Sequence, residues 1–218
     1  MIKKMKALLL CALFLTGAGV MSGSAAFART GDLKIICTVF PAYDWFRNIL
    51  GDGPADLTLL MDKGVDLHSY QPSVADVAKI SDCDVFVYVG GESDGWVDGV
   101  LKERKNKDMV VINLLAALGD AVKEEEAVEG MEEEHDHNDH DDHDDEEEPE
   151  YDEHVWLSLK NAATLCRYAA DRLGEADPAG AARYKANADA YVARLEELDA
   201  KYAEAVGTAS SKSSVFED

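Results

Sequence analysis

The histidines are the residues of this chain whose type and spacing indicate chemistry. Four of the six fall within nine residues that are otherwise Asp and Asn, and the other two lie on either side of that run. The four in the run are His135, His137, His140 and His143, and the flanking pair is His68 and His154. Neutral imidazole and carboxylate are the donors that a borderline divalent metal prefers, and zinc above all. The sequence therefore indicates that the protein handles a divalent metal.

The acidic segment around the four histidines carries most of the net charge. The chain has 218 residues and a formal net charge of −23, and 19 of its 44 acids lie between Glu124 and Glu153, which leaves 25 against 21 Lys and Arg. We expect residues 119–153 to be largely disordered without a ligand. A solvated spacer is the usual fate of a charge block. A calcium-binding loop of the EF-hand type is excluded, because that pattern needs glycine at its sixth position. Counted from Asp136, the sixth position is Asp141. Four histidines in nine residues favour a third interpretation, a weak collector of metal ions.

The first 28 residues predict a secretion signal. Lys3, Lys4 and Lys6 form a charged region, residues 7–15 are apolar, and residues 26–28 make an A-x-A cleavage site. A membrane anchor is disfavoured, because a span takes about 20 apolar residues and glycines and serines interrupt this run. We therefore expect a mature chain that starts near Arg29, secreted across the inner membrane into the periplasm or to the cell surface.

Three cysteines remain after such a cleavage, and none belongs to a C-x-x-C motif. They are Cys37, Cys83 and Cys166. This spacing excludes a thiolate zinc knuckle and leaves room for at most one disulfide. We expect each thiol to be a small buried hydrophobe.

Short apolar runs that alternate with helical patterns predict an α/β lobe with a parallel sheet flanked by helices. Strands are expected over 33–39, 56–61, 84–89 and 109–112, with helices over 41–50, 73–80 and 96–104. Helical periodicity returns at Ser158. From 184 to 205 apolar residues recur at alternating steps of four and three, which predicts one spanning helix of roughly 40 Å at 1.5 Å per residue.

The predicted elements divide the chain into an ordered series of segments. A lobe covers 29–118, the acidic loop 119–153, and helices including the long one 154–206. Residues 207–218 would start a second α/β lobe, whose first strand could begin at Val215. Nothing follows for that strand to pair with, so we expect the second lobe to be missing or truncated.

Two loops place His68 and His154 where a ligand could bind. His68 follows a predicted strand, and ligands of parallel sheets bind beyond the carboxyl ends of strands. His154 directly precedes a predicted helix. The glycine-rich segment 90–95 lacks the patterns of phosphate-binding loops, no hydrolase motif is present, and no basic stripe would bind nucleic acid. We therefore expect a metal-binding protein, not an enzyme or a partner of nucleic acid.

Three segments resemble the zinc and manganese solute-binding proteins of ABC transporters, a family that includes adhesin-like lipoproteins. The segments are LMDKGVDLHSYQPS at 60–73, DCDVFVYVGGESDGW at 82–96 and DEHVWLS at 152–158, and the similarity runs from about 33 to 206. The resemblance implies two α/β lobes joined by a long rigid helix, and a monomer that captures Zn²⁺ for a membrane permease with its ATPase.

The resemblance also implies roles for individual residues. His68 and His154 would be the first two metal ligands, the others would come from the second lobe, and Asp218 falls near the place of the third. Mn²⁺ or Fe²⁺ is the competing cargo, although the histidine content favours zinc. Two other readings stay open: an envelope zinc buffer or metallochaperone that acts through the His-rich loop, and a zinc hydrolase with Glu153 as its base.

Overall fold

A four-stranded parallel sheet is the centre of the molecule. The computed structural model describes residues 31–62, 64–123 and 151–210. The strands are β1 Leu33–Cys37, β2 Ala55–Leu59, β3 Val85–Tyr88 and β4 Val110–Asn113, in the order β2-β1-β3-β4. The chain leaves β1 for β2 on one side and then returns to β3 on the other. The loops that follow β1 and β3 therefore diverge, which forms the crevice where parallel sheets bind ligands.

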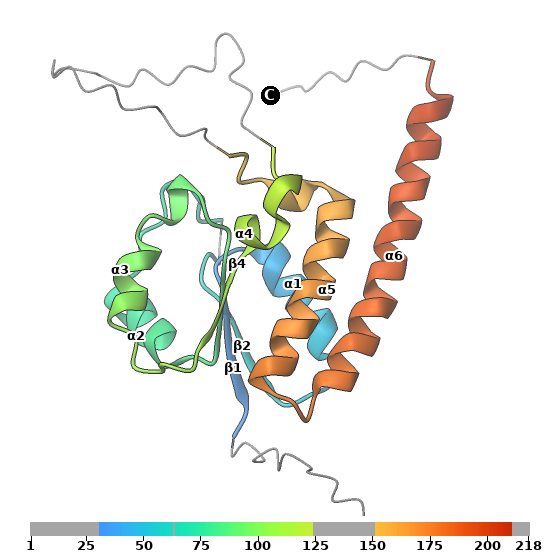
Figure 1. Cartoon of the computed structure of the whole chain (residues 1–218). Coiled ribbons are helices and arrows are strands. Elements are labelled where there is room, and N and C mark those ends of the chain that lie inside the picture. The colour runs from blue at the N-terminus through green and yellow to red at the C-terminus, as the bar shows by residue number, and fades with distance from the viewer. Residues whose placement is uncertain (1–30, 63, 124–150, 211–218) are drawn as a thin grey trace, which may run out of the picture.

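Helices cover both faces of this sheet, as the sequence predicted (Figure 1). The helices α1 Phe40–Leu50, α5 Leu159–Ala176 and α6 Ala181–Thr208 lie on one face, and α2 Val74–Asp82 and α3 Val97–Lys102 lie on the other. A short helix that was not predicted, α4 Leu114–Leu118, follows β4 directly. Three 3-10 turns complete the described elements: η1 Glu92–Asp94, η2 Gly119–Ala121 and η3 Val155–Leu157.

Local capping explains where the helices begin. The Ser73 hydroxyl accepts the Asp76 N–H and the Asp76 carboxylate accepts the Ser73 N–H, which is the reciprocal capping box of α2. Ser158 accepts the Asn161 N–H at the start of α5, where the sequence predicted it. Among the described helices, none has the length and hydropathy needed to cross a membrane. The predicted signal, residues 1–28, lies outside the described residues, as does 124–150.

The three thiols are buried and unpaired. Cys37, Cys83 and Cys166 form no disulfide with one another, and burial raises the pKa of each thiol, to about 12 for Cys83 and Cys166. This confirms the expectation that they act as small hydrophobes.

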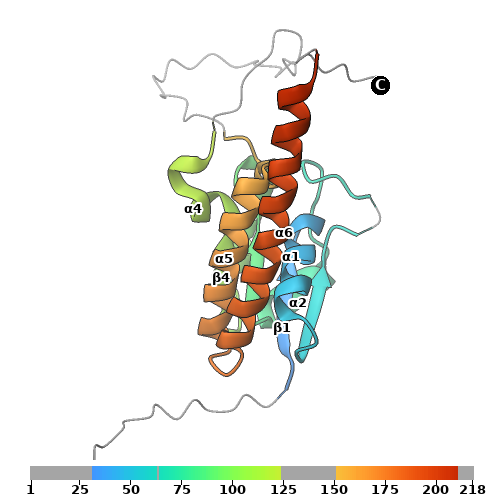
Figure 2. The same cartoon turned by 90° about the vertical axis from the view of Figure 1, so that its right-hand side faces the viewer.

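The long helix α6 has two different halves. Its first half packs on α5 and α1 and buries Tyr184, Ala188 and Val192. Its second half extends beyond the end of α5 (Figures 1 and 2). Leu198, Tyr202 and Val206 continue the apolar face there and are exposed.

Candidate metal centre

The structure brings His68 and His154 together at the carboxyl edge of the sheet. Their ring centroids lie 5.6 Å apart and their planes are inclined at 51°. Two imidazoles bound to one tetrahedral zinc at 2.0–2.1 Å would have centroids about 5 Å apart. The observed separation is therefore suited to a shared ion.

The His68 loop is held by its neighbours in sequence. The Asp66 side chain accepts the His68 backbone N–H at 2.8 Å. Leu67 and Tyr70 are buried on either side, and the Tyr70 ring meets Trp96 edge-on with centroids 5.8 Å apart. Because Leu67 and Tyr70 are buried in the core, they fix the backbone from which the exposed His68 imidazole extends.

His154 is positioned by Asp152. One oxygen of that carboxylate, Oδ1, accepts the His154 backbone N–H at 2.8 Å and lies 3.1 Å from ring Nδ1. A carboxylate can only accept, so this contact favours the tautomer with its proton on Nδ1, in which Nε2 is the nitrogen that can bind a metal. Trp156 meets the same ring edge-on at 5.4 Å.

The loop after β3 connects the two histidine loops. Ser93 Oγ lies 3.0 Å from His68 Nδ1, and the Ser93 backbone N–H donates to Glu153 Oε1 at 2.9 Å. Gly91 has a φ of +80°, and a Cβ at this position would overlap the Glu153 carboxylate. Gly91 therefore leaves the space that the Glu153 carboxylate occupies.

Two buried carboxylates directly neighbour Ser93 and His154 in the chain. Asp94 and Glu153 are 4% and 7% exposed. Asp94 accepts the Gly90 N–H at 2.9 Å. Burial raises the pKa of Asp94, and the charge of Glu153 contributes to the same effect. Asp94 Oδ1 and Glu153 Oε2 find no hydrogen-bond partner among the described residues.

The described residues supply two nitrogen donors rather than a complete metal site. No group of three or more His, Cys, Asp and Glu able to hold a metal occurs within residues 31–62, 64–123 and 151–210. The four loop histidines and the possible further ligand are outside that part of the chain; they are His135, His137, His140, His143 and Asp218. The Glu153 side chain is buried and accepts a hydrogen bond from the Ser93 N–H, which argues against its use as the general base of a hydrolase.

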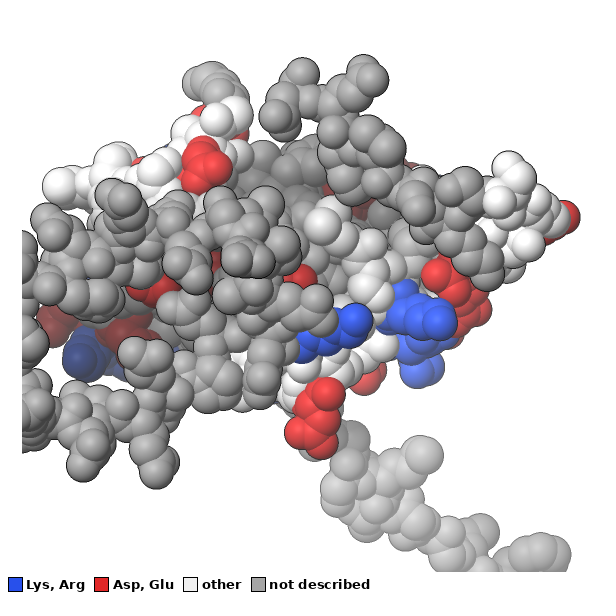
Figure 3. Space-filling model, turned by 90° about the horizontal axis from the view of Figure 1, so that it is seen from above, with Lys and Arg blue, Asp and Glu red and all other residues white. Residues whose placement is uncertain are grey.

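Charged side chains of both signs occur at this end of the molecule. Viewed from above, described Lys and Arg side chains lie beside Asp and Glu (Figure 3).

A hollow at the opposite edge of the sheet is lined by Lys34, Asp56 and Asp82. The Lys34–Asp82 ion pair at 2.6 Å neutralises part of the negative charge there. That hollow contains no histidine, so the candidate metal centre is at the carboxyl edge.

Sequence reasoning predicted both histidines as ligands but did not single out Ser93. Serine has no motif of its own, although its position just beyond a strand, at the same edge as His68, is a usable signal. Glu153 was considered only as a base, because glutamate is rarely buried.

Comparison with known proteins points to one family. A profile of the periplasmic zinc-uptake complex component A family, ZnuA, matches residues 35–217. The zinc-binding protein AdcA of Streptococcus pyogenes serotype M3 is 32% identical over 191 residues, covering 85% of this chain and 36% of that protein. The high-affinity zinc uptake system protein ZnuA of Bacillus subtilis is 33% identical over 193 residues, covering 88% of this chain and 57% of that protein.

A solved structure shows the same fold. The Zn(II)-bound ZnuA-like domain of Streptococcus pneumoniae AdcA has a TM-score of 0.62 and 32% identity, covering 83% of this chain and 58% of that one. The chain thus spans less than two thirds of the length of each of these three proteins.

Proposed function

The chain belongs to the zinc-uptake complex component A family, and from this premise we propose that it captures Zn²⁺ outside the cytoplasm for a membrane permease. The observation that carries the proposal is the approach of His68 and His154 to a centroid distance of 5.6 Å. Each ring has its Nδ1 beside an oxygen of its own, Ser93 for one and Asp152 for the other. Both Nε2 atoms are then available for one ion.

The two imidazoles would form half of a zinc site. Zinc in proteins is usually four-coordinate, so two further ligands are needed. We propose that they come from residues outside the described part, and that α6 leads towards a second lobe that contributes them. The relatives are longer than this chain, which supports this arrangement. Zinc has no redox chemistry of its own, so such a site can bind and release its cargo unchanged.

The acidic loop would act as a separate, weaker collector. Residues 124–150 contain His135, His137, His140 and His143 among carboxylates. A dense negative field raises the local concentration of cations, and imidazoles retain them weakly. Histidine donors also favour zinc over Mn²⁺, which prefers oxygen ligands.

Zinc titration calorimetry on site and loop variants tests this proposal. His68→Ala and His154→Ala should each weaken the tighter binding event at least about tenfold, because each removes a donor. A matched variant with the four loop histidines changed to Ala should keep that event and lose only weaker binding. Tight binding that survives His68→Ala would refute the site.

Deletion of residues 124–150 separates the receptor from the alternative metal buffer. A receptor keeps its tight site without the loop, whereas a buffer that acts through the loop loses nearly all of its bound zinc. The measurement is zinc per chain after dialysis against a weak chelator.

A further inference from the structure

A continuous chain of contacts joins the two imidazoles through protein atoms. Ser93 Oγ faces His68 Nδ1 at 3.0 Å, and the Ser93 N–H donates to Glu153 Oε1 at 2.9 Å. Glu153 is bonded directly to His154. Three separate segments, the loops after β2 and β3 and the residues before α5, are thereby fixed to one another.

We infer that Ser93 and Glu153 are positioning residues that preassemble the metal centre. Glu153 holds the Ser93 main chain, and Ser93 Oγ accepts a hydrogen bond from His68 Nδ1–H, which leaves Nε2 of His68 as the metal donor. Metal-binding histidines usually donate their other ring N–H to a protein acceptor in this way. This inference rests on the proposed function and adds residues that are not themselves ligands.

The two histidines differ in how firmly their contacts determine which ring nitrogen carries the proton. Asp152 can only accept from His154, so its tautomer is set by chemistry alone. A serine hydroxyl can donate or accept, so the direction of the Ser93–His68 contact is part of this inference. The Glu153–Ser93 contact holds the hydroxyl beside Nδ1, which leaves Nε2 as the ring nitrogen that remains for a metal.

The burial of Glu153 supports a functional reason for its position. The side chain is 7% exposed, and Oε2 has no hydrogen-bond partner within the described ranges. Such an arrangement costs stability, and a serine amide alone does not require a carboxylate. Gly91, at a φ of +80°, leaves the space that the carboxylate occupies. The turn is therefore built around Glu153.

Zinc affinity of serine variants is the first part of the test. Ser93→Ala should raise the Kd at the tighter site about tenfold, within the range seen when such supporting groups are removed. Ser69→Ala is the matched control, because Ser69 is exposed, adjacent to His68 and bonded to the Asp66 main-chain oxygen. It should change the Kd less than twofold, and Ser93→Thr, which keeps the hydroxyl, should restore most of the affinity. Equal Kd values for Ser93→Ala and Ser69→Ala would overturn the inference.

The second part reads the His68 tautomer in the metal-free protein. Long-range ¹⁵N–¹H spectra, assigned with His68→Ala, should show the proton on Nδ1 in the wild type and a shift towards Nε2–H in Ser93→Ala. Glu153→Gln keeps an acceptor for the Ser93 amide and should preserve the wild-type form, whereas Glu153→Ala should shift it. Thermal midpoints identify any variant that fails to fold, and Ser93→Ala then carries the test.

The two proposals fail in different ways. An unchanged His68 tautomer in Ser93→Ala refutes the positioning role and leaves zinc capture intact. Zinc affinity that is indifferent to His68→Ala refutes the metal centre itself, whatever the tautomer.

Discussion

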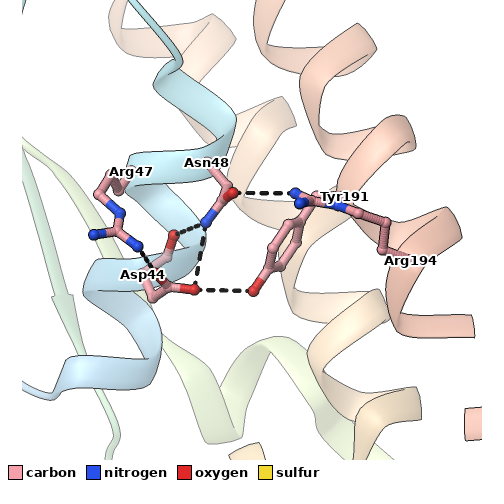
Figure 4. Close-up of polar contacts among 5 residues, drawn as sticks. All are labelled: Asp44, Arg47, Asn48, Tyr191 and Arg194. Atoms are coloured by element: carbon pink, nitrogen blue, oxygen red, sulfur yellow. Dashed lines mark hydrogen bonds and ion pairs between the residues drawn. The ribbon is translucent and has the colours of Figure 1, made fainter. Parts of the chain in front are cut away.

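The Tyr191 hydroxyl donates a hydrogen bond to Asp44 Oδ2 at 3.0 Å and so fastens α6 to α1 (Figure 4). Arg194 adds a second link to Asn48 Oδ1 at 3.1 Å, and the Asn48 amide donates back to the Asp44 main-chain oxygen. Helix α1 starts at the carboxyl end of β1. These contacts fix α6 to α1, and farther along the helix the Arg167–Glu196 ion pair at 2.8 Å links α6 to α5.

Removal of the Tyr191 hydroxyl should loosen this attachment. Tyr191→Phe is expected to lower the free energy of unfolding by about 1 kcal/mol, the usual net value of one hydrogen bond. Urea unfolding followed by circular dichroism measures it. Tyr202→Phe on the same helix is the control, because Tyr202 is 62% exposed and its change should be within about 0.5 kcal/mol. Equal effects of the two substitutions would contradict a role for the contact.

The tyrosines predict a loss of stability in alkali. Burial raises the pKa of Tyr191 to about 12, with further contributions from the hydrogen bond and charge of Asp44, and burial likewise raises Tyr70 and Tyr184 to about 12. In the unfolded chain a tyrosine titrates near pH 10. Their contribution is therefore complete below about pH 10 and is lost as the pH rises towards 12.

Unfolding free energies measured between pH 9 and 12 check this expectation. Tyr191→Phe removes one of the groups, so its stability should fall less steeply with pH than that of the wild type. The absorbance of phenolate reports the ionisation directly. Identical slopes for the two proteins would show that Tyr191 does not titrate with a raised pKa.

Much of the lobe follows from local sequence, but its assembly does not. The short apolar run at 33–39 predicted β1, and the helical pattern over 73–80 predicted α2. Helix α4 was missed because Leu114–Leu118 is apolar throughout and directly continues a strand. The strand order β2-β1-β3-β4 depends on packing between distant segments, which no local pattern encodes.

The candidate site shows the same division. His68 and His154 were predicted as ligands because they lie in two loops at the mouths of elements and on either side of a His-rich run. Their 5.6 Å separation depends on how α5 packs on the sheet, which the sequence alone does not specify. The structural role of Glu153 was not predicted, because its burial depends on Gly91, which lies 62 residues earlier in the chain.

Replacement of Asp94 should stabilise the protein at neutral pH. Burial, together with the charge of Glu153, raises the pKa of Asp94, so its ionisation opposes folding. The contribution of Asp94 is most favourable below the usual aspartate pKa and is lost as the pH rises through its folded value. Asp94→Asn keeps an acceptor for the Gly90 N–H and should add about 1 kcal/mol at pH 7.

The pH dependence of the unfolding free energy distinguishes this electrostatic cause from a stabilisation that is the same at every pH. The stabilisation by Asp94→Asn should shrink towards pH 4, where the wild-type carboxyl is increasingly protonated. Asp98→Asn, at an exposed position in α3, should change stability little at either pH. A gain of equal size at pH 4 and pH 7 would refute the electrostatic explanation.

Two glycines should respond in opposite directions to substitution by alanine. Gly91 has a φ of +80° and lies against Glu153, so Gly91→Ala should cost about 1–3 kcal/mol and also weaken zinc binding. Gly99 is within α3 with open space around its Cβ position, so Gly99→Ala should be neutral or stabilise by up to about 1 kcal/mol. Thermal unfolding and zinc calorimetry on both variants check this. Normal zinc affinity in a folded Gly91→Ala would argue that the Glu153 carboxylate does not need its observed place.

The exposed apolar face of α6 should contribute nothing to the stability of the described lobe. Leu198, Tyr202 and Val206 follow one another at steps of four and are 41%, 62% and 55% exposed. Leu198→Gln and Tyr202→Gln, made separately, should each alter the unfolding free energy by less than about 0.5 kcal/mol. Val192→Ala, in the buried half of the same helix, should cost about 2 kcal/mol, because Val192 is 1% exposed. If the Gln substitutions were as costly as Val192→Ala, this face would have a partner within the chain in solution. If they also increased solubility, the face would be a surface that a further segment or molecule normally covers.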